Sequence, residues 1–223
     1  MSHALRTPLN AIIGFTGTLL MKLPGPLTGD QDKQLKTIQT SARHLLSLIN
    51  DLLDVAKIES GKLELDMVPV VCQEVVAEVV DTLQALAEQK GLTFKTDVPS
   101  EPITLSTDRR ALNQILLNFA NNAIKFAETG AITIGLTQRT ENGQAITHFA
   151  VTDSGIGIRP EDQGKLFQAF MQLDSASTRR YGGTGLGLYL SQRLAELING
   201  RLSFHSEYGK GSTFVLELTS APN

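Results

Sequence analysis

Apolar positions in the first quarter of the chain recur with the spacing of two helices. They repeat at alternating intervals of four and three residues from Leu5 to Leu23, and at intervals of three and four from Leu35 to Ala56. This spacing is typical of one seam of a helix in a coiled bundle. Residues that favour turns separate the two runs: Pro24, Gly25, Pro26 and Gly29. The pattern therefore predicts a helical hairpin.

A single hairpin leaves its apolar stripe half covered. Pairing with a second copy into a four-helix bundle would cover the rest, so we expect the hairpin to dimerise. The alternative is that the hairpin packs on the remainder of its own chain.

After Gly61 the pattern becomes mixed, and Lys62–Val71 reads as a linker with a short strand. Further helices are predicted at Cys72–Gln89, Arg109–Ala127 and Leu186–Ile198. Strands are predicted at Thr93–Val98, Ile103–Thr107, Ile132–Arg139, Ile146–Asp153, Leu202–Glu207 and Thr213–Thr219. The expected architecture is an α-helical hairpin over residues 1–66, followed by an α/β sandwich over residues 67–223.

A long connection between Gly155 and Gly185 has little periodicity apart from a short segment, Glu161–Phe170. A loop of this length in a compact domain is usually functional, and often a lid.

Composition limits the classes of function. Lys and Arg together number 20 and Asp and Glu 23, which gives a net charge of −3 and argues against a nucleic-acid surface. No apolar run approaches the ~18 residues of a membrane span, and no segment has the layout of a signal peptide. The single cysteine, Cys72, excludes an internal disulfide and reads as a filler of a small apolar site.

The sequence Asp153-Ser154-Gly155-Ile156-Gly157 follows a predicted strand. That strand would bring a carboxylate to a sheet edge where glycines let a ligand approach the backbone. Alone, the segment reads equally well as a strand that ends in a turn, since Asp and Gly are favoured there.

A second glycine-rich run, Gly182-Gly183-Thr184-Gly185-Leu186-Gly187, directly precedes a predicted helix. Free backbone amides and the positive end of a helix dipole suit phosphate. The run is neither a Walker loop nor a dinucleotide fingerprint, and alone it could be a flexible hinge.

Asn118, Asn122 and Lys125 are spaced to lie on one face of a predicted helix. The amide oxygen of Asn122 is a ligand suited to a hard cation, and Lys125 would bring a point charge to phosphates. A solvated polar face is the alternative.

These segments together resemble the transmitter core of a sensor histidine kinase: Ser2-His3-Ala4-Leu5-Arg6-Thr7-Pro8-Leu9, the asparagine segment Asn118–Phe126 and the two glycine runs. The resemblance covers nearly the whole chain. It implies a dimerisation and phosphoacceptor hairpin, a Bergerat-type ATP-binding fold, and ATP and Mg²⁺ as cofactors. Autophosphorylation of His3 would be followed by transfer to an aspartate of a response-regulator receiver domain.

The resemblance also assigns residues. It implies catalytic roles for His3, Thr7, Asn118 and Arg179, and a metal-ligand role for Asn122. Adenine would be recognised by Asp153, and the aromatics of Leu166–Phe170 would anchor the lid. Contacts to the nucleotide are implied at Asn118, Asn122, Lys125, Asp153, Gly155, Gly157, Phe170, Arg180, Gly183, Thr184, Gly185, Leu186 and Gly187.

Two positions modify the expected chemistry. In gyrase-like and chaperone relatives of this ATP fold, a glutamate one turn before the metal-binding asparagine activates water; here that position is Asn118, a poor base, so hydrolysis should be slow. Neutral imidazole can instead accept phosphoryl, and His3 is expected to be exposed on the flank of the bundle. Ala4 stands where the family usually has Glu or Asp, so the reaction should be slowed, since a positioned base contributes about 10²–10⁴-fold.

Thr7, one turn after His3, implies a phosphatase activity toward the partner's aspartyl phosphate. Pro8 should weaken the helix and let the hairpin change shape. The chain begins so close to the motif histidine that we expect it to be a cytoplasmic fragment without its upstream sensor, whether or not the full-length protein is anchored in a membrane.

Two other functions remain open. A degenerate kinase, favoured by Ala4, would be a dimerising binding module regulated by ATP. A free-standing ATPase would release phosphate without His3, and Asn118 argues against it.

Overall fold

The computed structural model describes residues 2–141, 143–171 and 184–219, and the side chains from Leu5 onward within these ranges. The chain divides into two compact units. One comprises Met1–Leu63 with Asp174–Leu186, and the other Glu64–Leu173 with Gly187–Asn223.

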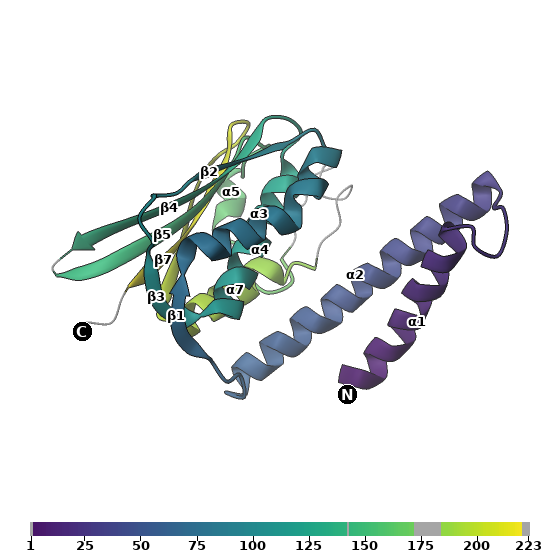
Figure 1. Ribbon diagram of the computed structural model, residues 1–223, viewed down its shortest axis with the longest axis horizontal. Helices are drawn as coiled ribbons and strands as arrows, with labels where there is room; N and C mark the ends of the chain where they lie inside the picture. Colours follow the sequence, from purple (N-terminus) through teal and green to yellow (C-terminus); the bar gives the residue numbers. More distant parts are fainter. Residues whose placement is uncertain (1, 142, 172–183, 220–223) are drawn as a thin grey trace. The chain divides into compact units, whose positions relative to one another are not determined.

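The first unit contains the predicted hairpin. Helix α1 (Ser2–Leu20) and helix α2 (Gly29–Glu59) run side by side in opposite directions (Figure 1). The second helix begins well before its first periodic leucine because Thr28 and Gln31 form a capping box, in which each side chain accepts a hydrogen bond from the other residue's backbone amide (3.2 and 2.9 Å). Pro8 lies inside α1.

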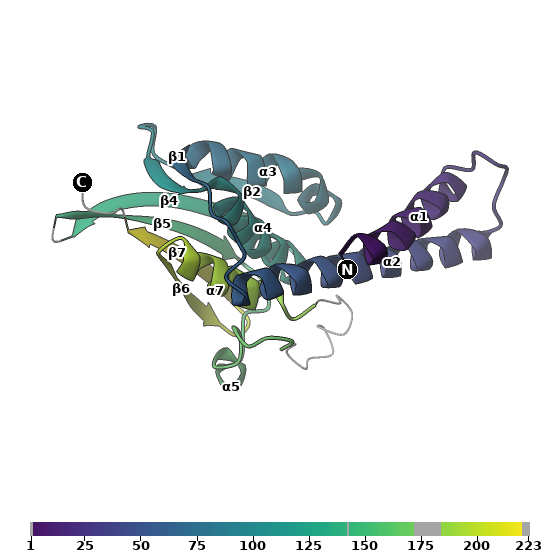
Figure 2. The same ribbon diagram turned by 90° about the horizontal axis from the view of Figure 1, so that it is seen from below.

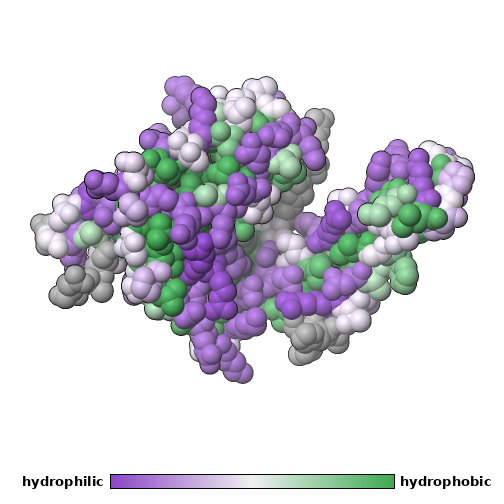
Figure 3. Space-filling model, viewed as in Figure 1, coloured by the Kyte–Doolittle hydropathy of each residue, from purple (hydrophilic) through white to green (hydrophobic). Residues whose placement is uncertain are grey.

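Much of the apolar surface of the hairpin is exposed to solvent. Figure 3 shows apolar residues along its surface. The exposed members are Leu5, Ile12, Phe15, Met21, Leu23, Ile38, Leu45 and Leu52. The buried apolar side chains described in the two helices are few: Leu9, Ala42 and Val55. The stripe that the sequence predicted is therefore only partly covered within one chain.

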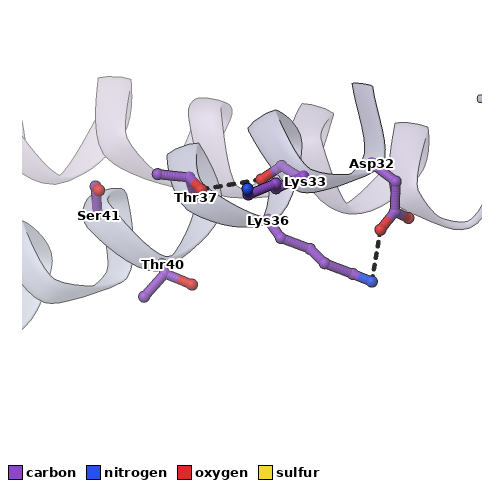
Figure 4. Close-up of a pocket in the computed structure, with 6 residues that line it drawn as sticks. All are labelled: Asp32, Lys33, Lys36, Thr37, Thr40 and Ser41. Carbon is purple, nitrogen blue, oxygen red and sulfur yellow. Dashed lines mark hydrogen bonds and ion pairs between the residues drawn. The ribbon is translucent and has the colours of Figure 1, made fainter. Parts of the chain in front are cut away.

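Another face of α2 is polar and bears a hollow of about 490 Å³ (Figure 4). An ion pair between Lys36 and Asp32 (2.6 Å) lies at its edge. The residues that line it all come from this one helix: Asp32, Lys33, Lys36, Thr37, Thr40 and Ser41. None of them is a residue that the sequence assigns to the nucleotide or to phosphoryl transfer.

The second unit is built on two sheets. Strands β1 (Met67–Val71) and β3 (Thr104–Asp108) form an antiparallel pair. The larger sheet has the order β2-β4-β5-β7-β6, with β2 parallel to β4 and the other pairs antiparallel. Its strands are β2 (Thr93–Asp97), β4 (Ala131–Glu141), β5 (Gln144–Asp153), β6 (Gly200–Glu207) and β7 (Gly211–Thr219).

Three helices cover one face of the larger sheet (Figure 2). They are α3 (Cys72–Gln89), α4 (Arg109–Phe126) and α7 (Gly187–Leu197). The core lies between helices and sheet, where Phe149 is fully buried between its strand partners Leu136 and Leu216. Alternation along these strands buries one face and leaves the other half-exposed, which is the sandwich that the sequence predicted.

Within the periodic segment Glu161–Phe170, helix α5 covers Pro160–Gln163, and most of the rest forms turns. The chain beyond α5 also makes an aromatic contact. The ring of Phe167 lies 6.0 Å from that of Phe204, which in turn lies 5.9 Å from Phe214. Backbone hydrogen bonds between residues three apart, such as those from Lys165 N to the Asp162 carbonyl and from Gln168 N to the Lys165 carbonyl (both 3.1 Å), hold the segment in turns, and the aromatic contact packs it on β6.

No helix in the described part of the chain is both long and apolar enough to cross a membrane.

Candidate active site

Helix α4 carries the predicted asparagine face. Asn118, Asn122 and Lys125 lie along its second half, and its other side buries Ile115, Phe119 and their neighbours in the core. Lys125 is half-buried, with its ammonium 4.8 Å from the centre of the Phe126 ring. Burial lowers the pKa of Lys125, and the nearby charge of Lys90 lowers it further. A site with an under-solvated cation of this kind favours an anionic ligand.

Asp108 anchors the start of α4. Its carboxylate accepts hydrogen bonds from the amides of Arg110 and Ala111 (both 2.9 Å) and from that of Asp66 in the linker (2.8 Å). Burial alone would raise the pKa of Asp108, but these amides and the charge of Arg110 hold it below its usual range. The carboxylate therefore fixes the helix that carries the asparagines.

The other end of α4 is also held by a side chain. Lys90 Nζ donates hydrogen bonds to the carbonyls of Ile124 (2.8 Å) and Lys125 (3.1 Å). A cation at a helix C-terminus satisfies the last carbonyls and opposes the helix dipole.

Asp153 ends strand β5 and is only 8% exposed. The Gly155 amide donates to Asp153 Oδ1 (2.8 Å). Burial raises the pKa of Asp153, although hydrogen bonds from the amides of Gly155 and Ser212 oppose the rise. A buried acceptor of this kind suits a neutral N–H donor, such as an exocyclic amine.

The glycines after Asp153 are required by close packing. A Cβ at Gly155 would lie 2.5 Å from the Phe126 carbonyl oxygen at the end of α4. Gly157 has a φ of +64°, and a Cβ there would overlap the backbone of Glu207. The two glycines therefore let α4, the end of β5 and the end of β6 meet.

Sequence reasoning missed the turn between β6 and β7, which packs against the backbone of Asp153 and of the residues that follow it. Gly209 N donates to the Ile156 carbonyl (2.8 Å), and Gly211, with a φ of +119°, packs against the carbonyl of Asp153. Ser206 Oγ accepts from the Ile158 amide (2.9 Å) and donates to the Gly211 carbonyl (3.0 Å). The signal was Gly209-Lys210-Gly211 between two predicted strands.

The second glycine run is described only in part. Gly183 lies outside the described residues, as do Arg179 and Arg180. Thr184, which belongs to the first unit, accepts a hydrogen bond from Leu186 N (3.1 Å) and donates one to Asp51 Oδ2 on α2 (3.1 Å). Leu186 is buried. Gly185 has a φ of +68°.

Helix α7 begins at Gly187 and packs against α4. Asn118 meets its first two turns: Nδ2 donates to Ser191 Oγ (2.8 Å), and Oδ1 occupies the space that a Cβ at Gly187 would need. The asparagine face of α4 therefore joins the N-terminus of α7.

Phe170, which the resemblance assigns to the nucleotide, is 63% exposed and has a φ of +62°.

Comparison with known proteins gives the family. The sequence pattern of the "His Kinase A (phospho-acceptor) domain" matches residues 1–61, and that of the "Histidine kinase-, DNA gyrase B-, and HSP90-like ATPase" matches residues 107–222. The chain belongs to the histidine kinases.

The chain is similar to known histidine kinases over almost all of its length. The chain is 44% identical to the signal transduction histidine-protein kinase BarA of Escherichia coli (strain K12), covering 96% of the chain and 23% of BarA. It is 37% identical to the autoinducer 2 sensor kinase/phosphatase LuxQ of Vibrio cholerae, covering 98% of the chain and 25% of LuxQ. The full-length structure of ShkA in complex with AMPPNP matches with a TM-score of 0.78 at 32% identity, covering 100% of the chain and 45% of ShkA. The chain thus spans about a quarter of these curated relatives.

The motif histidine of this histidine kinase lies in the first turn of α1, and its side chain is outside the described part of the structure. The same holds for the side chain of Ala4. Thr7 lies one turn after His3 and is exposed. Between them, Arg6 Nε donates to Asn50 Oδ1 on α2 (2.9 Å), which ties the turn that carries His3 to the second helix.

The residues of the second unit fit a metal-bound nucleotide. Within the described ranges, no three His, Cys, Asp or Glu side chains gather to hold a metal by themselves. An asparagine oxygen such as that of Asn122 can supply one hard ligand, and phosphate oxygens and water supply the others in typical magnesium–nucleotide sites. Buried Asp153, half-buried Lys125 and the N-terminus of α7 add the polar groups that a nucleotide needs.

Proposed function

We propose that residues 67–223 form a catalytic domain that binds Mg·ATP and that residues 1–66 form a hairpin that presents His3 as phosphoacceptor. Asp153 would accept a hydrogen bond from the adenine amino group. Asn122 would hold Mg²⁺ through its amide oxygen, and Lys125 would face the phosphates. Gly183–Gly187 and Arg180 would surround the phosphates, with Phe170 at the lid and Arg179 stabilising charge on the transferring group.

The environment of Asn118 supports transfer to a protein acceptor in preference to water. A carboxamide is not a base at neutral pH, and its amide nitrogen is already used as a donor to Ser191 (2.8 Å). Water in this site would therefore lack the carboxylate that activates it in hydrolytic relatives. Phosphoryl can then leave ATP only slowly unless another nucleophile arrives.

His3 supplies that nucleophile. The lone pair of one neutral ring nitrogen forms a bond to the γ-phosphorus, while the bond from phosphorus to the bridging oxygen breaks and ADP leaves. The other ring nitrogen then loses its proton. Because Ala4 carries no carboxylate, water receives this proton, which makes the step slower than with an acidic neighbour. The phosphoryl group passes next to an aspartate of a receiver domain, separate from or fused to this chain.

Labelling with γ-³²P-ATP tests this function. The expected product is protein-bound label that is stable to base and labile to acid, and that is absent from the His3→Gln variant. His44→Gln on α2 serves as a matched control, since it removes a histidine from the same hairpin. Label that persists in His3→Gln, or label lost equally in both variants, would contradict the assignment of His3.

Ala4 favours one other function, that of a degenerate kinase in which the hairpin is a binding module and ATP only regulates it. This alternative predicts tight Mg·ATP binding with no label on either the chain or an added receiver domain. The same labelling experiment, accompanied by a binding titration, separates the two.

We further propose that the hairpin forms a homodimer through its exposed apolar stripe. Ile38, Leu45 and Leu52 repeat every seven residues along α2 and are each about half exposed (47, 47 and 51%). Such a row is typical of a bundle seam. Sedimentation analysis should give a dimer that Leu45→Glu converts to monomer, whereas Lys33→Glu on the polar face of α2 should leave it intact.

Thr7 supports a second output. LuxQ is named as a kinase and phosphatase. We propose that Thr7 orients water for hydrolysis of the receiver's aspartyl phosphate. Thr7→Ala should then slow loss of label from the receiver while leaving autophosphorylation of His3 within about twofold.

A further inference from the structure

The carboxamide of Asn118 lies across the first two turns of α7. Its nitrogen donates a hydrogen bond to Ser191 Oγ (2.8 Å), and Ser191 lies 73 positions after Asn118 in the sequence. Its oxygen lies against Gly187, where any Cβ would overlap it. Gly187 and Ser191 are one helical turn apart on α7, so both can contact the same amide group.

Gly187 is therefore required for a reason other than flexibility. Helix α7 starts at this residue, and its φ is not in the left-handed region. What a side chain would meet is Asn118: its oxygen, then Cγ at 3.1 Å and Nδ2 at 3.3 Å. The last glycine of the second run therefore leaves room for the Asn118 amide.

The amide has a defined orientation in the structure. The two ends of an asparagine amide are similar in shape, so their hydrogen bonds decide the orientation. With the nitrogen on Ser191, the oxygen is held toward Gly187, at the N-terminal end of α7. An amide oxygen repels phosphate oxygens but suits a metal ion or the water bound to one.

Ser191 is an unusual residue for its place. It is only 2% exposed, between the buried side chains Leu190 and Leu194 of the same helix. A buried hydroxyl costs free energy unless it is hydrogen-bonded, and serine is a weak helix former. Its hydrogen bond to Asn118 offsets that cost.

We propose that Ser191 is a positioning residue for Asn118: it holds the carboxamide against Gly187, with the amide oxygen presented at the N-terminus of α7. This deepens the proposed function and rests on it, because the oxygen would then face the magnesium side of Mg·ATP.

The first test needs no nucleotide. Side-chain amide NMR of the full chain, with Asn118 assigned through Asn118→Ser, reports whether its NH₂ protons are hydrogen-bonded. In Ser191→Ala the Asn118 protons should shift and exchange faster with water, and Ser191→Thr, which keeps the hydroxyl, should restore them. Thr107→Val is the control: it removes a buried hydroxyl on β3 that has no hydrogen-bond partner among the described residues, so the Asn118 signals should not move. Unchanged signals in Ser191→Ala would overturn the proposal.

The second test measures nucleotide affinity with and without Mg²⁺. Ser191→Ala should weaken binding of Mg·ATP by roughly threefold to tenfold, as expected for loss of one hydrogen bond at a polar site, and should weaken metal-free ATP by less. Thr107→Val should bind both forms as the parent does. Equal weakening of both forms would contradict the orientation of the oxygen.

The two tests fail separately. If the parent chain does not bind Mg·ATP, the proposed function fails while the NMR result still decides the role of Ser191. If the parent binds Mg·ATP and Ser191→Ala changes neither the NMR signals nor the affinity, only the inference fails.

Discussion

Replacing Asp153 with Asn should weaken binding of Mg·ATP and should also change how the free energy of unfolding depends on pH. Asp153 is 8% exposed, and burial raises the pKa of its carboxyl. The Gly155 amide already donates to Oδ1 at 2.8 Å. In the Asp153→Asn variant the remaining acceptor oxygen can keep that bond, but the NH₂ group replaces the acceptor that would receive the adenine amino group.

The size of the effect follows from the hydrogen bond that is lost. A hydrogen bond to a charged group contributes about 1.5–3 kcal/mol, which corresponds to roughly 10- to 150-fold in dissociation constant. Two donors would also face each other, so we expect the upper part of this range. Isothermal titration of Mg·ATP at pH 7.5 measures it, with circular dichroism to verify that the variant is folded.

In the unliganded protein, the contribution of Asp153 to the free energy of unfolding should fall as the pH rises. Because the pKa of Asp153 is higher in the folded than in the unfolded chain, ionisation disfavours the fold. The contribution of Asp153 is therefore most favourable below the unfolded pKa of about 3.9, is lost as the pH rises through the folded pKa, and is constant above it. Asn does not titrate. The free energy of unfolding of Asp153→Asn minus that of the parent should thus rise with pH over this window.

Two results would refute this reasoning. One is a Kd for Mg·ATP in folded Asp153→Asn within twofold of the parent value, which would remove Asp153 from the nucleotide site. The other is a difference in free energy of unfolding, variant minus parent, that stays flat or falls as the pH rises across the window. It would show that ionisation of the buried carboxyl does not destabilise the fold.

Three further predictions concern other parts of the chain. Ala4→Glu should restore a proton acceptor beside His3 and raise the autophosphorylation rate by up to about 10²–10⁴-fold, measured by initial incorporation of label; an unchanged rate would mean that water already suffices. Asp108→Ala should cost about 2–4 kcal/mol in urea unfolding, because it removes the N-cap acceptor of the buried Ala111 amide and the acceptor of the part-buried Asp66 amide, whereas Asp108→Asn should cost less. Pro8→Ala should restore a hydrogen bond inside α1 and alter the ratio of kinase to phosphatase activity, and an equal ratio in both chains would count against a hinge at this residue.

Local patterns in the sequence determined the elements and the kinds of group that they carry. Helix α3 runs from Cys72 to Gln89, as the apolar spacing and Gly91 predicted. Asn118, Asn122 and Lys125 share a face of α4 because helical geometry depends only on their separation. Chemistry that resides in single residue types, such as an amide in place of a carboxylate at Asn118, could also be read without a structure.

Tertiary structure alone decided which groups meet. Nothing near Ser191 in the sequence indicates that it would bind Asn118, and Gly211 gives no local sign that it packs on the backbone of Asp153. The strand order, with β2 parallel to β4, and the contact of Phe167 with Phe204 were likewise set by packing. The physical reason is that periodicity reports the environment of each residue, buried or exposed, whereas a hydrogen bond between distant segments depends on the relative placement of two elements. The sequence thus proposed the residues of the candidate site, and the packing of α7 and of the β6–β7 turn decided which of these groups meet.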